Sequence, residues 1–114
     1  MSVERTPKLA YGVELTRSEI RAVCIKLIPG FGLQEATVDP EEDLVKYLGP
    51  WVRAEMMGSC WSDDTYLVLG PRLEWDEANG TISCHPKGLE EVRKIVSDHF
   101  PEKKMKWFHD IYVW

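Results

Sequence analysis

The chain of 114 residues is 44% hydrophobic and 29% charged, with a formal net charge of −5. This length fits one domain that can bury roughly two thirds of its unfolded surface, and the hydrophobic content excludes a disordered chain. The acidic balance disfavours general binding to nucleic acids or anionic membranes, because both need Lys and Arg. We predict a single globular domain over residues 1–114, beginning with a flexible lead at residues 1–7.

The first predicted element is a strand over residues 8–15, where apolar side chains alternate with polar or small ones. A period of two places each set on its own face of a strand. One of these faces is unusually small at Ala10 and Gly12. Such residues indicate either close packing under another element or room for a ligand. We favour close packing, because glycines inside strands often mark close backbone approach.

A helix is predicted directly after this strand. Thr16 and Glu19 have the spacing of a capping box, in which each side chain accepts from the backbone N–H of the other residue. Apolar residues then follow at helical spacing. They are Ile20, Val23, Cys24 and Leu27. Pro29 and Gly30 end the helix. Because Cys24 belongs to the apolar stripe, we interpret it as a buried small hydrophobic residue rather than a nucleophile.

The second predicted helix begins at Asp39, with Pro40 at its first position and acids in its first turn. Its apolar stripe consists of Leu44, Tyr47 and Leu48. A Gly-Pro pair at residues 49–50 ends it. The acidic run at residues 39–43 is explained by the helix dipole, which favours acids at an N-terminus, so it does not by itself indicate a metal.

The middle of the chain reads as three short strands. Residues 65–69 form a continuous apolar run that predicts a buried strand, broken by the Gly-Pro pair at residues 70–71. Two further strands flank Asn-Gly at residues 79–80, which is a strong hairpin signal. A two-residue turn there pairs Trp75 with Cys84 and places both on one face of the hairpin.

A third helix is predicted from an apolar stripe that ends before Pro101. The stripe consists of Leu89, Val92, Ile95, Val96 and His99. The last strand covers residues 105–114 and is apolar on both faces from Ile111 onward. Such a strand is normally central in a covered sheet, or it is sealed by another chain. The element order predicts an α+β two-layer domain, with a mostly antiparallel sheet of about four to five strands packed by three helices.

The loop at residues 58–64 holds the candidate catalytic residues Cys60, Asp63 and Asp64. A loop cysteine with a histidine elsewhere is the minimal outline of a thiol nucleophile. Two carboxylates beside a stacking aromatic, here Trp61, would suit sugar hydrolysis. The same residues are also ordinary turn formers, and no histidine lies near Cys60 in the sequence, so we expect binding rather than catalysis.

The sequence predicts neither a metal nor a cofactor. Its remaining soft ligands are scattered. They are Cys60, Cys84, His85, His99 and His109. None forms the close Cys or His pair that structural zinc sites show. Gly30-Phe31-Gly32 lacks both the third glycine and the preceding strand of a phosphate-binding loop.

The three cysteines have no regular spacing, and no apolar leader or membrane-length run is present in the sequence. An odd number of cysteines without a framework is typical of free thiols in a reducing compartment. We therefore expect a cytoplasmic or nuclear protein.

Large, soft and aromatic side chains are the candidate binding residues, because they adapt their shape and bury area at interfaces. They are Met56, Met57, Trp61, Trp75, Trp107, Tyr112 and Trp114. These residues predict a non-catalytic binding or regulatory domain with an aromatic-rich protein–protein surface. Its partner would be another protein or a second copy of the chain.

Two alternatives stay open. The first is a small-ligand binder or small hydrolase, with a pocket over Ala10 and Gly12 that is walled by Trp61 and Trp75 and served by the loop candidates. The second is nucleotide or nucleic-acid binding through residues 103–108, where three lysines lie next to Trp107 and Phe108.

Overall fold

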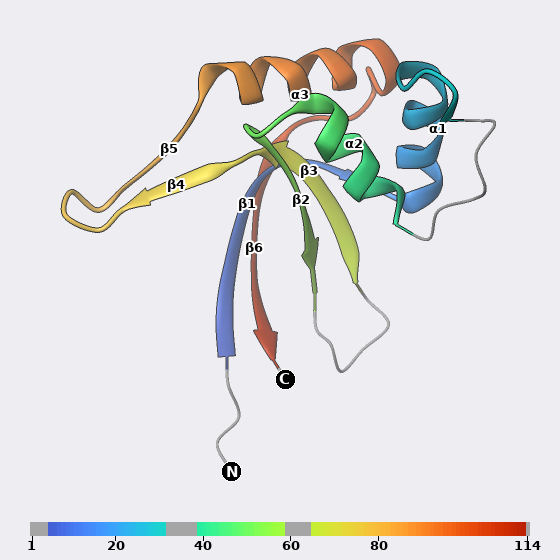
Figure 1. The fold of residues 1–114 in the computed structure, drawn as a ribbon. Helices are drawn as coiled ribbons and strands as arrows, with labels where there is room; N and C mark the ends of the chain where they lie inside the picture. Colours follow the sequence, from blue (N-terminus) through green and yellow to red (C-terminus); the bar gives the residue numbers. More distant parts are fainter. Residues whose placement is uncertain (1–4, 32–38, 59–64, 114) are drawn as a thin grey trace.

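The computed structural model describes residues 5–31, 39–58 and 65–113, and the side chains of these ranges except those of residues 5–8 and 110–113. The described chain is α+β, as predicted, with strands and helices in the order β-α-α-β-β-β-β-α-β (Figure 1). The elements are β1 Arg5–Leu15, α1 Arg17–Leu27, α2 Pro40–Leu48, β2 Val52–Met57, β3 Tyr66–Pro71, β4 Leu73–Asp76, β5 Thr81–Cys84, α3 Pro86–His99 and β6 Lys106–Val113.

Four of the strands form one antiparallel sheet in the order β2-β3-β1-β6, and β4 and β5 form a separate hairpin. Two connections contain helices, and each joins strands that are separated by one other strand in the sheet. The first joins β1 to β2, with β3 between them, and the second joins β3 to β6, with β1 between them. This is the split β-α-β arrangement. β1 is shared between two partners, because residues 5–12 pair with β6 whereas residues 13–15 pair with β3.

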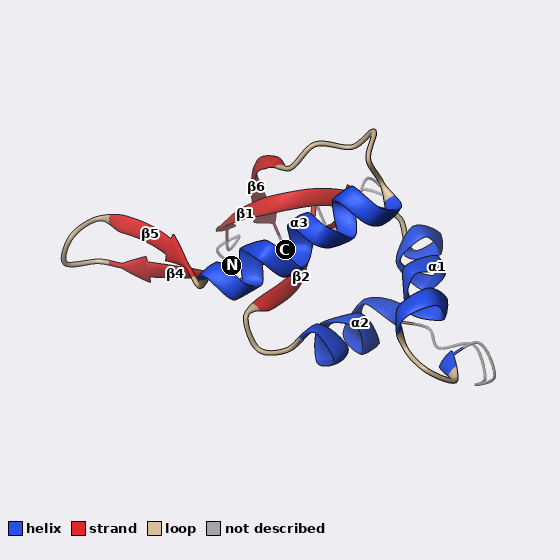
Figure 2. Cartoon of the chain, turned by 90° about the horizontal axis from the view of Figure 1, so that it is seen from above, coloured by secondary structure: helices blue, strands red, loops and turns tan. Residues whose placement is uncertain are grey.

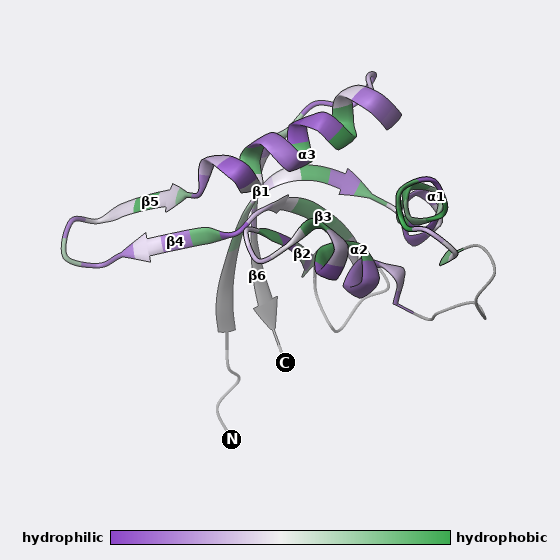
Figure 3. Ribbon diagram, turned by 45° about the horizontal axis from the view of Figure 1, so that its top comes forward, coloured by the Kyte–Doolittle hydropathy of each residue, from purple (hydrophilic) through white to green (hydrophobic). Residues whose placement is uncertain are grey.

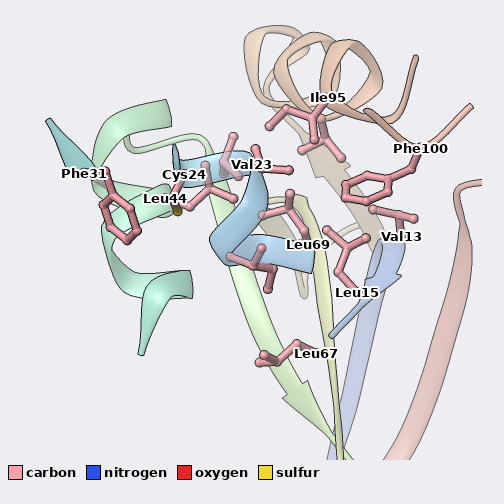
Figure 4. Close-up of a cluster of buried hydrophobic side chains, with 13 residues drawn as sticks. Val13, Leu15, Val23, Cys24, Phe31, Leu44, Leu67, Leu69, Ile95 and Phe100 are labelled. Carbon is pink, nitrogen blue, oxygen red and sulfur yellow. The ribbon is translucent and has the colours of Figure 1, made fainter. Parts of the chain in front are cut away.

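The helices cover one face of this sheet, and the hydrophobic residues of α3 are turned toward the strands (Figure 3). Burial of each large apolar side chain contributes about 1.5–3 kcal/mol. The resulting core cluster comprises Val13, Leu15, Ile20, Val23, Cys24, Phe31, Leu44, Val52, Leu67, Leu69, Val92, Ile95 and Phe100. Cys24 lies between Val23 and Leu44 in this cluster (Figure 4), which confirms its interpretation as a small hydrophobic residue.

β1 and β3 approach each other closely at two glycines. A Cβ atom on Gly12 would overlap the carbonyl oxygen of Leu69, and one on Gly70 would overlap the carbonyl oxygen of Tyr11. The space beside Gly12 is therefore filled by the backbone of β3. This confirms close packing at Gly12. The ligand pocket that we considered also needs Trp61, which lies outside the described residues, and it stays a prediction.

The sheet also buries a second, smaller cluster on the face away from the helices. It comprises Ala10, Met57, Val68 and Phe108, with Tyr66 packed against it. The rings of Tyr66 and Phe108 lie 5.8 Å apart. This is unexpected from the strand register, because Phe108 pairs with Ala10 near the middle of β1, whereas Tyr66 lies beyond Leu67, which pairs with Leu15 at the end of β1. Residues 5–12 and β6 must therefore bend across this face. We call this strand pair the terminal ribbon.

Two strands, β1 and β3, are longer than predicted, and one strand, β2, was not predicted. β1 begins at Arg5, three residues before the predicted start, so residues 5–7 pair with β6 in the terminal ribbon. β3 continues through Gly70 and Pro71. Its pairing with β1 stops at Leu69, so Pro71 pairs with β2 on one side only and lies at an edge, where proline is tolerated. β2 was not predicted, since Ala, Glu and Met have low strand propensity. Its pairing with β3 along its whole length overrides that local preference.

The hairpin has a longer turn than predicted. Trp75 pairs with Ile82 rather than with Cys84, because Asp76 organises the turn. Its carboxylate accepts hydrogen bonds from the backbone N–H of Ala78 at 3.0 Å and of Asn79 at 3.3 Å, and from the side-chain amide of Asn79 at 2.7 Å. The observed register of the hairpin differs from the predicted one by two residues. Because side chains alternate with a period of two, Trp75 and Cys84 still share a face.

We predict that Gly12→Ala destabilises the protein by about 2–3 kcal/mol, because a forced overlap with backbone atoms cannot be relieved by a side-chain rotation. Urea unfolding followed by circular dichroism measures the change. The matched control is Glu14→Ala, an exposed position two residues along the same face of β1, which is expected to change stability by less than about 0.5 kcal/mol. Equal stability of the two variants would contradict the close contact.

Candidate functional site

The helix layer covers only part of the sheet face on which it lies. Leu9 and Tyr11 share the face of Val13 in β1, and the register places Trp107 beside Tyr11. Val13 is buried under the helices, but Leu9 is 39% exposed and Trp107 is 55% exposed. The rings of Tyr11 and Trp107 contact each other, with centroids 5.0 Å apart. The terminal ribbon runs away from the helices (Figure 1), and its exposed Leu9 and Trp107 form an uncovered apolar strip.

A second uncovered apolar face lies on the hairpin of β4 and β5, which we call the arm. The arm projects from the body in two perpendicular views (Figure 2). Its register places Leu73 opposite Cys84 and Trp75 opposite Ile82, all on one face. Trp75 is 62% exposed. An isolated two-stranded hairpin is only marginally stable in water, so packing on this face would stabilise it.

The arm and the terminal ribbon meet at their bases. Leu9, Tyr11 and Leu73 line one small cavity of about 100 Å³. The two apolar surfaces therefore adjoin, and we call the combined surface the aromatic corner. It is defined by Leu9, Tyr11, Leu73, Trp75 and Trp107.

β6 lies at the edge of the sheet, so it is not the central strand that its two apolar faces favoured. Within the described ranges, only β1 pairs with it. The other side of β6 is an edge of the kind that accepts a strand from another chain. The second interpretation, a strand sealed by another chain, stays a prediction.

The predicted binding residues fall into three groups. Trp75 and Trp107 lie in the aromatic corner. Met57 is fully buried in the second cluster, whereas Met56 is partly exposed beside a cavity. Trp61, Trp114 and the side chain of Tyr112 lie outside the described residues, as do the catalytic candidates Cys60, Asp63 and Asp64.

Three corner residues were not predicted as binding residues, namely Leu9, Tyr11 and Leu73. Their alternation was visible in the sequence, but it normally indicates burial, as it does for Val13. Only the position of the helices shows which residues of one alternating face stay uncovered.

The largest cavity that we describe lies where β1 ends and α1 begins, and its volume is about 510 Å³, within the range of small-molecule sites. It is lined by Glu14, Leu15, Thr16, Arg17, Glu19, Met56, Thr65, Tyr66, Leu67 and Lys103. The cations on its rim are paired within the chain. Lys103 Nζ lies 3.0 Å from Glu19 and also donates to the carbonyl of Glu14, while Arg17 lies 3.3 Å from both Asp39 and Glu41.

Glu19 joins this cavity to the capping box that the sequence predicted. Its backbone N–H donates to Thr16, and its carboxylate accepts from the backbone N–H of Thr16 at 3.0 Å and from Lys103. Burial alone would raise the pKa of Glu19, but the bonds from Thr16 and Lys103 outweigh it and lower the pKa below the ordinary value of 4.5. The charged form is therefore stabilised by folding.

The lysine-rich segment does not present one continuous surface. Lys103 is held by Glu19, and Phe108 is buried in the second cluster with the Lys106 ammonium 5.2 Å from its ring centre. Trp107 lies on the opposite face of β6 from Phe108. These side chains therefore do not lie together on one face, and nucleotide binding through residues 103–108 stays a prediction.

Two of the three histidines, His85 and His99, lie beside aromatic rings, whereas His109 is exposed on β6. His85 caps α3 by accepting from the backbone N–H of Lys87, and its ring stacks on Trp51 at 4.1 Å. His99 lies beside Phe100, with ring centres 6.3 Å apart. In the part of the chain that the structure describes, no three His, Cys, Asp or Glu side chains form a group that could hold a metal ion.

Comparison with known proteins gives no relative from which a role could be transferred. No family model matches the chain, and neither a curated protein nor a solved structure matches it. None of the described helices is both long enough and apolar enough to cross a membrane. The function must therefore be inferred from the geometry of the aromatic corner and of the cavity.

We predict that Glu19→Gln lowers the free energy of unfolding by about 1 kcal/mol at pH 7, because it weakens a cap and an ion pair. Since the folded pKa of Glu19 is lowered, its stabilisation is complete above its unfolded pKa of 4.5 and is lost as the pH falls through the folded value. The two proteins should therefore converge on acidification, in urea unfolding at a series of pH values. A pH-independent difference would contradict the charge interaction.

A second prediction concerns thiol reactivity. Burial raises the pKa of Cys24 to about 11, and the nearby carboxylates of Asp43 and Glu41 add to this effect. Only about 0.1% of this thiol is then ionised at pH 8. Iodoacetamide should modify the half-buried Cys84 well before Cys24, as followed by peptide mass spectrometry. Urea should abolish the difference, and rapid labelling of Cys24 in the folded protein would contradict its burial.

Proposed function

We propose that this chain is a non-catalytic domain that binds another protein chain through the aromatic corner. The observation that supports this proposal is that one sheet face continues beyond the helices and there presents Trp107 and Leu9 to solvent. Trp75 adds a second exposed indole on the adjoining arm. Tryptophan and tyrosine are enriched at the energetic centres of protein interfaces, because they combine a large apolar area with few rotatable bonds.

The geometry of the corner suits a protein better than a small molecule. Its exposed apolar side chains belong to two strand pairs, which extend from the body in different directions (Figure 1). The only cavity we assign to it holds about 100 Å³, which is below the usual range for small-molecule sites. β6 adds an edge where backbone groups of a partner strand could also bond.

A small-ligand binder remains the second candidate, and the 510 Å³ cavity is the observation that favours it. Leu15 and Leu67 offer an apolar wall, while Lys103 and Arg17 are already paired with carboxylates of the chain. The exposed side chain of Glu14 also lines the cavity. A ligand with an apolar body and a positive group would suit this arrangement best.

The proposed function predicts site-specific cross-linking in the cells that make the protein. Trp107 is replaced by the photoreactive residue p-benzoylphenylalanine, and we expect one discrete protein adduct after irradiation. The matched control is the same replacement of Ile25, a residue of α1 with equal exposure of 55%. If positions 9, 75 and 107 give no more adduct than position 25, the proposal is wrong.

A further inference from the structure

The turn at the tip of the arm holds the only asparagine of the chain, Asn79. The turn spans residues 77–80, all of them exposed, and connects Asp76 with Thr81, which pair at the ends of β4 and β5. Gly80 follows Asn79 with a φ of +61°, a left-handed conformation that glycine adopts without strain. Apart from its chain neighbours, no described atom lies within 4 Å of the place that a Cβ on Gly80 would occupy. The backbone at Gly80 is therefore open to solvent.

The side chain of Asn79 also holds this turn together. Its amide nitrogen Nδ2 donates to Asp76 Oδ2 at 2.7 Å, the shortest of the hydrogen bonds that this carboxylate accepts in the turn. A carboxylate accepts hydrogen bonds but cannot donate them, so this bond needs the amide group of residue 79. The bonds from Asn79 are the largest causes that hold the pKa of Asp76 below its ordinary value of 3.8. The turn therefore depends on the amide of one side chain.

The same amide is chemically labile, because asparagine is among the thermolabile residues. The backbone nitrogen of Gly80 and the side-chain carbonyl carbon of Asn79 belong to one short stretch of chain, so a bond between them closes a five-membered ring. A Cβ on the following residue would hinder this closure, and glycine has none. The hydrogen bonds to Asp76 oppose it, but water competes for these bonds in an exposed turn.

We propose that Asn79 is a site of spontaneous deamidation, and that the reaction removes the amide that holds the turn of the arm. The nitrogen of Gly80 attacks Cγ of Asn79 and loses its proton, the Cγ–Nδ2 bond breaks, and the amide leaves with that proton as ammonia. Water then adds to one of the two carbonyl groups of the resulting succinimide and opens the ring to aspartate or isoaspartate. Water is the only co-reactant, and nothing is oxidised or reduced. This inference does not depend on the proposed function.

The product of this reaction places a second carboxylate beside Asp76. Its Oδ2 atom loses the donor that lay 2.7 Å away and gains a neighbour of like charge, which destabilises the turn. A hairpin of two strands is only marginally stable in water, and in the described sheets β4 and β5 pair only with each other. The arm, which carries Trp75, should therefore lose order as the protein ages, while the four-stranded sheet stays intact.

The first test incubates the purified full chain at body temperature and mildly alkaline pH in water enriched in oxygen-18, and follows it over days by peptide mass spectrometry. We expect residue 79 to take up the labelled oxygen, with a mixture of aspartate and isoaspartate that electron-transfer fragmentation distinguishes. Gln34, the only glutamine of the chain, is the internal control and should stay unlabelled, because its longer side chain closes a ring more slowly. An unlabelled residue 79 in the folded protein would overturn the proposal.

The role of the following residue is tested with Gly80→Ala, in which we expect labelling of residue 79 to slow at least about tenfold, because the new Cβ hinders ring closure. A side chain at a positive φ also strains the folded turn. The comparison is therefore repeated in urea, where the turn is absent and only the steric effect of the Cβ remains. Equal labelling of the parent and the variant in urea would exclude attack by the backbone nitrogen and overturn the proposal.

The consequence for the turn is tested with Asn79→Asp, which reproduces one product, and with Asn79→Ala, which removes the amide without adding a charge. The carboxyl signal of Asp76 in NMR spectra reports its pKa. We expect this pKa to rise toward its ordinary value in Asn79→Ala and further in Asn79→Asp, because a second carboxylate disfavours ionisation. Unchanged signals from the four-stranded sheet are the check on folding. A pKa of Asp76 that is the same in the parent and in Asn79→Asp would show that the amide does not hold the turn, and would overturn the proposal.

Discussion

The contact between the backbones of β1 and β3 at Gly12 and Gly70 is the constraint on which the rest of the structure depends. Neither position has room for a Cβ atom, so the two strands approach more closely than strands with side chains could. β1 changes its partner from β6 to β3 at this point. The terminal ribbon can then bend across the sheet and bury Phe108 against Tyr66. Both faces of a small sheet thereby gain a hydrophobic cluster.

The same bend explains why an apolar strip is left uncovered. The three helices pack against β2, β3 and the second half of β1, where they form the core. The terminal ribbon, which carries Tyr11 and Trp107, extends beyond the area that the helices cover. Apolar surface left in water forgoes about 25 cal/mol per Å² of burial. Both this strip and the arm would be stabilised by a partner that removes them from water, which is the physical basis of the proposed binding role.

The cavity and the aromatic corner differ in what they leave available for binding. At the cavity, the ammonium of Lys103 and the guanidinium of Arg17 already have carboxylate partners, so an anionic ligand would have to displace interactions that the fold uses. At the corner, the large apolar side chains of Leu9, Trp75 and Trp107 are still exposed to solvent. The corner therefore offers more new interactions to an incoming chain.

The sequence by itself determined the local structure. The Thr16–Glu19 capping box, the apolar stripe that buries Cys24 and the alternation in β1 all depend on residues a few positions apart. Only the tertiary structure decided that Val52–Met57 is a strand, that β6 lies at the sheet edge and that Leu9 and Tyr11 stay exposed while Val13 is buried. Alternation shows which side chains share a face, but whether another element covers that face depends on contacts between residues far apart in the chain.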